Sequence, residues 1–184
     1  MNIRYKTVTI WNENDWSAAA PLYDEALPPQ GRKTARHIRR ILDTLSGALH
    51  LAEDPSGETA AMAVTGDLPE LGAMLIDYIA VRGTMRGRGV GRGMVEYLEK
   101  TARQNGKRAV VVEIEADPTP ANERRERFWT SLGFTRTEYV HRYRWVPEPY
   151  RALYKPLRED AALPLVGEVL FRSITAFHRN IWQG

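Results

Sequence analysis

The chain has 184 residues and a mass of 21.0 kDa, and 43% of its residues are hydrophobic, which fits one globular domain. It has no cysteine, so a disulfide scaffold, a thiol nucleophile and a thiolate zinc site are excluded, and no apolar run approaches the roughly 18 residues of a membrane span. Of the 26 basic residues 21 are arginines, which favours an anionic partner, but a net charge of +3 does not favour nucleic-acid binding.

The first half of the chain alternates between strand and helix patterns. Pro21 lies inside the first helical pattern and predicts a kink or a break there. The second helical pattern has one apolar face, and its other face carries Arg32, Lys33, Arg36, Arg39 and Arg40. The predicted elements are, in order, strand Lys6–Trp11, helix Asn14–Ala26, helix Gly31–Leu45, strands Ala48–Ala52 and Glu58–Thr65, which a turn at residues 54–57 joins, and strand Ala73–Val81.

The second half continues with buried-type strands and capped helices. Thr119 is placed to cap a helix that begins at Pro120 and ends before Gly133. The predicted elements are helix Gly89–Asn105, strand Ala109–Ile114, helix Pro120–Leu132, strands Phe134–Tyr143 and Tyr150–Leu157, and an amphipathic helix at about residues 166–182. We therefore expect a single α/β (α+β) domain over residues 1–184, with a mixed sheet and a C-terminal helix.

A glycine-rich segment, Arg86–Gly93 (RGRGVGRG), lies between the strand Ala73–Val81 and the following helix. Its glycines let the backbone approach a ligand, and the amides at a helix N-terminus favour an anion. The spacing excludes the dinucleotide fingerprint, and the segment does not end in the G-K-[S/T] of a P-loop. The sequence thus predicts a phosphate cradle, against the simpler alternative of a tight turn with solvated arginines.

Two segments resemble the GNAT superfamily of acetyl-CoA-dependent N-acetyltransferases, and some of its bacterial members in particular. They are residues 79–98 (IAVRGTMRGRGVGRGMVEYL) and residues 122–134 (NERRERFWTSLGF), which occur in the family's order with one strand between them. The resemblance covers about residues 48–157. It implies a GNAT-like, mostly antiparallel sheet flanked by helices, in which the parallel central strands Ala73–Val81 and Ala109–Ile114 splay apart to hold acetyl-CoA.

The resemblance also implies which residues contact coenzyme A. The strand end would pair with the pantetheine arm, the glycine loop would hold the pyrophosphate, and the asparagine of the second motif would bond the pantetheine side. The implied cofactor-binding residues are Ile79, Ala80, Val81, Arg86, Gly87, Arg88, Gly89, Val90, Gly91, Arg92, Gly93, Asn122 and Trp129.

Acetyl transfer to an amine needs a proton acceptor and a donor for the leaving thiolate. The candidate bases are Glu113, then Asp77, then Glu115, which lie on the two central strands; for each the alternative is a salt bridge to an arginine. Trp129 stands where the family carries its tyrosine acid, and an indole cannot deliver a proton. Tyr139 is a candidate replacement, with Tyr143 and water as alternatives.

The sequence therefore predicts an enzyme that transfers an acetyl group from acetyl-CoA to a primary amine of a small molecule or peptide, directly and without an acyl-enzyme. The alternative is a CoA-binding module with little activity. The four histidines show no metal-ligand spacing, so no metal is expected. The N-terminus lacks the apolar centre of a signal peptide, so we expect a cytoplasmic protein. Trp145, Trp182 and the last amphipathic helix could form a homodimer contact or dock on the sheet.

Overall fold

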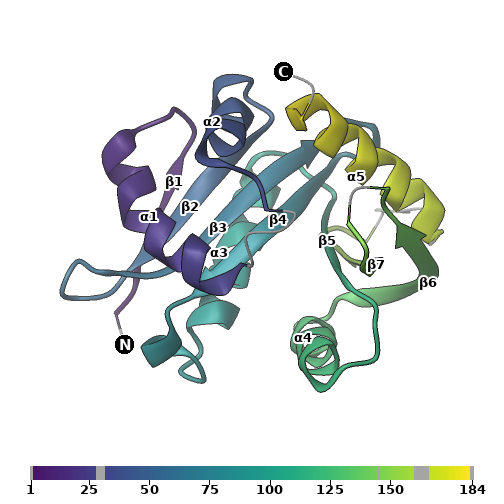
Figure 1. Ribbon diagram of the computed structural model, residues 1–184. Coiled ribbons are helices and arrows are strands. Elements are labelled where there is room, and N and C mark those ends of the chain that lie inside the picture. Colours follow the sequence, from purple (N-terminus) through teal and green to yellow (C-terminus); the bar gives the residue numbers. More distant parts are fainter. Residues whose placement is uncertain (1, 28–31, 145, 160–165, 183–184) are drawn as a thin grey trace. The chain divides into compact units, whose positions relative to one another are not determined.

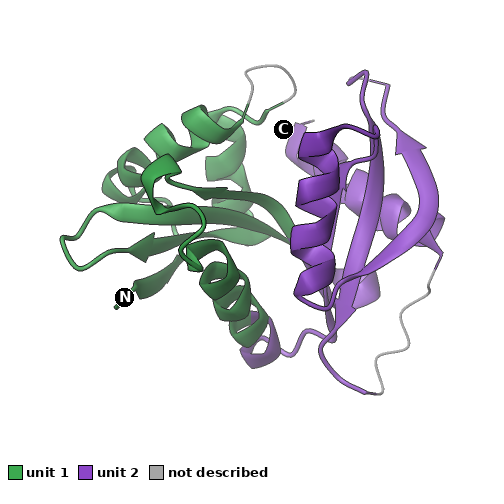
Figure 2. Cartoon of the chain, turned by 90° about the horizontal axis from the view of Figure 1, so that it is seen from below, with its two compact units in different colours: residues 1–66, 76–101 green, residues 67–75, 102–184 purple. Residues whose placement is uncertain are grey.

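The computed structural model describes residues 2–27, 32–144, 146–159 and 166–182 (Figure 1). Two compact units divide the chain (Figure 2). Unit 1 contains residues 1–66 and 76–101, and unit 2 contains residues 67–75 and 102–184. Strand β4 contributes to both units, because its first three residues belong to unit 2 and the rest to unit 1.

The described residues form a mixed sheet of seven strands in the order β1-β2-β3-β4-β5-β7-β6. The neighbours β4 and β5 are parallel, and the remaining pairs are antiparallel, which confirms the predicted fold class. The strands are β1 Arg4–Val8, β2 Gly47–Glu53, β3 Thr59–Leu68, β4 Ala73–Val81, β5 Ala109–Glu115, β6 Thr135–Arg142 and β7 Pro149–Pro156. The helices are α1 Glu13–Ala26, α2 Ala35–Asp43, α3 Val90–Gln104, α4 Pro120–Ser131 and α5 Gly167–Trp182, with short 3₁₀ turns η1 Pro69–Leu71 and η2 Gly83–Met85.

In unit 1, helices α1 and α3 cover opposite faces of the sheet. Successive side chains of a strand point to opposite faces, and β1 follows this rule. Tyr5 stacks on Tyr97 of α3, and Thr7 hydrogen-bonds the same tyrosine, whereas Lys6 between them pairs with Asp15 of α1. The alternation in the sequence of β1 thus places one helix on each side of the strand.

The elements of unit 1 differ from the prediction at several points, and local contacts explain some of these differences. Strand β1 ends at Val8 instead of Trp11, and the side chain of Asn12 then accepts hydrogen bonds from the first amides of α1. Helix α1 runs through Pro21 to Ala26, so the break that was one of the two predicted outcomes does not occur. Helix α2 begins after its cap Thr34; the predicted start, Gly31, lies outside the described residues.

Unit 2 is built on the antiparallel strands β5, β7 and β6. Helix α4 packs against β5, and α5 packs against β6 and β7. The buried residues of α5 include the predicted apolar stripe, Leu170, Ile174, Phe177 and Ile181, and also Phe171. Helix α5 therefore docks on the sheet, as one of the two alternatives predicted. Trp182 is 39% exposed, Trp145 lies outside the described residues, and a homodimer contact stays a prediction.

The close approach of α5 to β6 depends on the first residue of the helix. A Cβ atom on Gly167 would lie 2.7 Å from the Oγ1 of Thr137 and 2.7 Å from the Cβ of Tyr139, which is closer than such atoms can pack.

Within the described residues no helix is long and apolar enough to cross a membrane.

Candidate functional site

The glycine loop of unit 1 has the backbone geometry of an open cradle. The loop follows β4 and η2, and α3 begins at Val90. Gly87 and Gly89 adopt left-handed conformations, with φ angles of 73° and 81°, and a Cβ atom on either would meet nothing within 4 Å. These two positions need glycine for their conformation, and the space above them is open. The first amides of α3, which have no partner within a helix, belong to the same turn.

The arginines of the loop are not equivalent. Arg86 is held by the protein, since its Nε donates to the carbonyl of Val81 at 3.0 Å and its guanidinium pairs with Glu25 at 3.2 Å. Arg88 and Arg92 are exposed and have no hydrogen-bonded or ion-pair partner among the residues that the structure describes. The first turn of α3 also lacks acidic residues. Two guanidinium groups that no described residue pairs with therefore lie beside Gly87 and Gly89.

Gly93, by contrast, is required by packing inside the protein. A Cβ atom at this position would lie 2.3 Å from the hydroxyl of Tyr5, whose ring stacks on Tyr97. The sequence reading treated the glycines of the loop as a single cradle. The structure separates Gly87 and Gly89, which face open space, from Gly93, which makes room for β1.

Asp77, one of the three candidate bases, is part of a buried ion pair in unit 1. Its carboxylate oxygens lie 3.0 and 2.9 Å from the Nζ of Lys33, and both side chains are 2% exposed. The ammonium of Lys33 also lies 5.0 Å from the ring centre of Tyr78. The prediction that Lys33 lies on the basic face of a helix, opposite its apolar face, is wrong, because this residue precedes α2 and its side chain is buried. A role of Asp77 as base would require the ion pair to open.

Two buried tyrosines hold the backbone around Lys33. The hydroxyl of Tyr78 accepts a hydrogen bond from the Lys33 amide at 3.1 Å, and the hydroxyl of Tyr23 donates to its carbonyl at 2.8 Å. Burial raises the pKa of both phenols far above the ordinary value, and for Tyr78 the charge of Asp77 adds to the effect. Both tyrosines therefore remain neutral and serve to fix the lysine.

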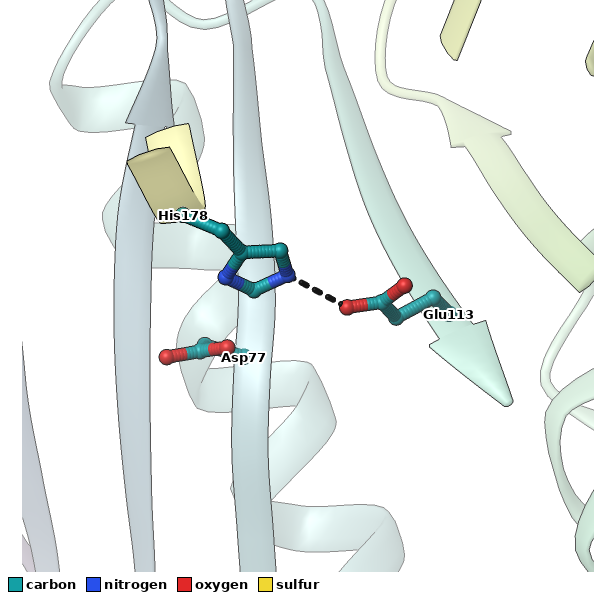
Figure 3. A group of neighbouring side chains, drawn as sticks. All are labelled: Asp77, Glu113 and His178. Carbon is teal, nitrogen blue, oxygen red and sulfur yellow. Dashed lines mark hydrogen bonds and ion pairs between the residues drawn. The ribbon is translucent and has the colours of Figure 1, made fainter. Parts of the chain in front are cut away.

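Glu113, the first candidate base, is held by two partners within unit 2. Its Oε2 accepts a hydrogen bond from the hydroxyl of Tyr143 at 2.6 Å, and its Oε1 lies 2.7 Å from the Nε2 of His178. Figure 3 shows the second bond, which joins β5 to a histidine of the C-terminal helix α5. The side chains of His178 and Glu113 are 8% and 11% exposed. The acidic, phenolic and imidazole groups thus form one nearly buried network.

A cluster of rings surrounds this network. His141 stacks on Phe171 with a ring separation of 4.5 Å and meets Tyr143 edge-on at 4.5 Å. Burial lowers the pKa of His141, so this ring is neutral at physiological pH. Tyr139, the predicted acid, hydrogen-bonds the Nδ1 of His141 at 3.3 Å. The tyrosine that donates to Glu113 is Tyr143, which the sequence offered only as an alternative.

Residues 10–134 match the profile of the Acetyltransferase (GNAT) family, and this range includes the glycine loop, both central strands and α4. The chain belongs to the GNAT family. A comparison with curated proteins finds no match.

Solved structures with the GNAT fold are similar to this chain. A GNAT-family protein from Bacteroides thetaiotaomicron is 20% identical, with a TM-score of 0.72 and 96% of each chain covered. One from Desulfovibrio desulfuricans is 16% identical with a TM-score of 0.69, and covers 85% of this chain and 100% of its own. The ribosomal-protein-S18-alanine N-acetyltransferase of Escherichia coli is 18% identical with a TM-score of 0.62, at 86% and 98% coverage. At these identities the likeness establishes the fold alone.

The two residues predicted from the second GNAT motif are both engaged inside unit 2. The side-chain amide of Asn122 donates to the carbonyl of Asp117 at 3.0 Å and accepts from Arg125 at 2.9 Å. Trp129 is 2% exposed and packs edge-on against Phe128 and Phe134. These contacts stabilise the two ends of α4, and binding of the cofactor by either residue stays a prediction.

Glu115, the third candidate base, lies at a different kind of site. It lies 3.5 Å from Arg125 and lines a hollow of about 270 Å³ beside α4. The charged residues around this hollow are Glu115, Asp117, Glu123, Glu126, Arg127, Arg136 and Arg151. Most of them pair with one another, as Arg136 does with Glu126 at 3.3 Å. The salt bridge that was the alternative for Glu115 is therefore present.

Sequence reasoning passed over one member of the network, His178. The sequence analysis weighed His178 only as a metal ligand, and its spacing to the other histidines does not indicate a metal site. One sign was available: His178 follows Phe177 inside the apolar stripe of an amphipathic helix, where an imidazole is buried only with a partner. The partner, Glu113, is 65 residues away in the sequence.

Proposed function

We propose that this GNAT-family chain transfers an acetyl group from acetyl-CoA to a primary amine of a small molecule or peptide. Family membership supports acetyl transfer in general. The cofactor assignment depends on the glycine loop of unit 1. Two left-handed glycines, Gly87 and Gly89, face open space there. Beside them lie Arg88 and Arg92, which have no ion-pair partner among the described residues.

The fit between this loop and a pyrophosphate follows from its charges and amides. A dianionic group is stabilised by amides at a helix N-terminus and by guanidinium groups, whose planar shape matches phosphate oxygens. Residues 86–93 would hold the pyrophosphate, and the backbone of residues 79–81 would bond the pantetheine arm. When bound, acetyl-CoA supplies an activated thioester, so direct attack by an amine needs no nucleophile from the protein.

The acceptor must lose a proton during this reaction, and we assign that task to the network around Glu113. Asp77 already bonds an ammonium and Glu115 lies near a guanidinium, whereas Glu113 bonds neutral or titratable partners. The alanine N-acetyltransferase from Escherichia coli, whose fold this chain shares, acts on an amine of a ribosomal protein. An amine acceptor on a small molecule or a peptide is consistent with this class.

The cofactor assignment is tested by substituting the two glycines that flank helix α3. Gly89 precedes α3, and Gly106 follows it with a φ of 71° and equally open surroundings, so glutamate costs similar backbone strain at either site. Acetyl-CoA at 100 times its Kd stabilises the wild-type fold by about 2.7 kcal/mol, or about 5–10 °C in Tm. We expect Gly89→Glu to abolish this shift and Gly106→Glu to keep it.

Two outcomes separate the possible functions. Thiol release from acetyl-CoA with any member of an amine panel establishes the transferase. Binding of acetyl-CoA without turnover on any amine favours the CoA-binding module instead. A full thermal shift in Gly89→Glu would show that the glycine loop does not hold the cofactor.

A further inference from the structure

Tyr5 of β1 lies against the first turn of α3, the helix that follows the glycine loop. A Cβ atom on Gly93 would lie 2.3 Å from the hydroxyl oxygen of Tyr5 and 3.6 Å from the ring carbon that carries it. Both residues belong to unit 1. Tyr5 precedes residues 10–134, the part of the chain that matches the GNAT family, so the family match assigns no role to this tyrosine.

The contact explains why residue 93 is a glycine. Gly93 lies inside α3 and, unlike Gly87 and Gly89, does not have a left-handed conformation. Alanine is the more favourable residue inside a helix, because glycine loses more conformational freedom on folding. The helix therefore gives up stability at this position, and what it gains is room for the hydroxyl of Tyr5.

The position of Tyr5 is fixed by its neighbours in unit 1. Its ring stacks on that of Tyr97, with the ring centres 5.0 Å apart and the planes 16° from parallel. Further along β1, the hydroxyl of Thr7 lies 2.8 Å from the hydroxyl of Tyr97 and 2.9 Å from the Nδ1 of His50. Burial, with a smaller contribution from Glu96, raises the pKa of Tyr5, so its phenol is neutral at physiological pH and does not repel an anion.

A hydrogen bond links this contact to the glycine loop. The amide of Gly93 donates to the carbonyl of Gly89 at 2.9 Å, which closes the first turn of α3. Gly89 is one of the two left-handed glycines that face open space. A displacement of Gly93 therefore also displaces Gly89 and the helix N-terminal amides between them.

From this geometry we propose that Tyr5 is a positioning residue for the cofactor: its contact with Gly93 sets the place of the first turn of α3, and so of the amides that hold the pyrophosphate. The proposal rests on the proposed function and adds to it a residue from outside the matched range. Hydrogen bonds from amides to oxygen are about 2.7–3.2 Å long. A methyl group on Gly93 would have to move by about 1 Å to reach an ordinary contact distance from the Tyr5 hydroxyl, which is enough to break such bonds.

The binding test measures the Kd for acetyl-CoA by isothermal titration calorimetry. We expect Gly93→Ala to raise the Kd at least about 10-fold, because the new methyl group displaces the first turn of α3. Tyr5→Phe removes the hydroxyl but keeps the ring, which leaves the methyl group an ordinary contact at 3.6 Å. The double variant Tyr5→Phe/Gly93→Ala should therefore bind acetyl-CoA at least about fivefold more tightly than Gly93→Ala.

The matched control removes a different hydroxyl from the same contact between β1 and α3. The hydroxyl of Tyr97 bonds Thr7 and is not among the atoms within 4 Å of the Cβ position on Gly93. Tyr97→Phe/Gly93→Ala should therefore bind acetyl-CoA as weakly as Gly93→Ala. Equal rescue by this variant would show that any loosening of the contact restores binding, and would overturn the assignment to Tyr5.

A second measurement separates positioning from stability. Urea unfolding gives the free energy of unfolding of each variant, and the Kd is measured where all variants are folded. A residue that serves packing alone would change the free energy of unfolding and leave the Kd unaltered. With an amine that is turned over, we expect Gly93→Ala to raise the KM for acetyl-CoA while kcat changes less than about threefold.

The results separate this proposal from the proposed function. If the wild type binds acetyl-CoA and Gly93→Ala binds it within about threefold as tightly, Tyr5 serves packing alone. The same holds if Tyr5→Phe does not restore binding to Gly93→Ala; in both cases our inference is wrong while the cofactor assignment stands. If the wild type does not bind acetyl-CoA, the proposed function fails and the role of Tyr5 fails with it.

Discussion

The buried pair of Lys33 and Asp77 provides a quantitative test of how unit 1 is stabilised. We consider Lys33→Met, which keeps the length of the side chain but removes the ammonium that lies within 3.0 Å of both carboxylate oxygens. Both side chains are 2% exposed, so water cannot replace the lost partner. The position of the ammonium 5.0 Å above the ring of Tyr78 adds a smaller cation–π contribution.

The expected loss is large because a carboxylate remains in the core. Removing one partner of a buried ion pair typically costs about 3–5 kcal/mol, which for a chain of this size corresponds to about 6–20 °C in Tm. Replacing both partners by apolar residues of similar volume is often neutral. We therefore expect the double variant Lys33→Met/Asp77→Leu to recover most of the stability that Lys33→Met loses.

The assay is urea unfolding of the wild type, the two single variants and the double variant, evaluated as a double-mutant cycle. A favourable coupling of at least about 2 kcal/mol between the two positions supports the reasoning. If Lys33→Met costs less than about 1 kcal/mol, or if the two single losses simply add, the pair does not stabilise the core as described. Activity of Asp77→Leu, measured in the stable double variant, also tests Asp77 as a candidate base.

Two further predictions concern the cores of the two units. Burial lowers the pKa of His50 to about 3 from an ordinary value of 6.5, so below pH 6.5 the unfolded chain binds a proton that the folded chain refuses; the free energy of unfolding should fall as the pH falls from 6.5 toward 3, by up to about 1.4 kcal/mol per pH unit, and His50→Gln should flatten this dependence in urea titrations. If the free energy of unfolding falls with pH equally steeply in the wild type and in His50→Gln, the prediction is refuted. Gly167→Ala should cost about 1–3 kcal/mol and accelerate hydrogen exchange in α5, because Thr137, which the new methyl would strike, is fixed by its bond to the carbonyl of Ala152 at 2.9 Å. The exposed neighbour variant Glu168→Ala should cost less than about 1 kcal/mol, and equal losses in the two variants would contradict the close packing.

The central elements of the fold could be predicted because their signals are local. Strand β4 has the bounds that its apolar run predicted, and α4 begins at the proline that follows the capping Thr119. The start of α1 was harder to place, because Asn12 caps the helix and the preceding strand ends earlier than its β-branched pattern suggests. At this boundary the strand pattern continues past the end of β1, so the sequence does not show that Asn12 already caps the helix.

The candidate site divides in the same way. The glycine loop could be found from residue types and spacing alone, because left-handed backbone strongly favours glycine. The pairs that Lys33 forms with Asp77 and His178 forms with Glu113 could not be found in this way. Lys33 looked like one more basic residue of an exposed face, and only the fold places it against Asp77. His178 carried no motif, and only the packing of α5 on the sheet brings it to Glu113.

The sequence by itself determined the family, the sheet with its helices and the position of the glycine-rich loop, since each follows from patterns within short segments of the chain. The tertiary structure decided which carboxylate is paired with which cation, which glycine serves packing instead of a ligand, and which histidine meets a glutamate. The physical reason is that the strength of an ionic or hydrogen-bonded contact depends on distance and burial. Glu113 and His178 are 65 residues apart along the chain, so only folding determines the distance between them and their burial.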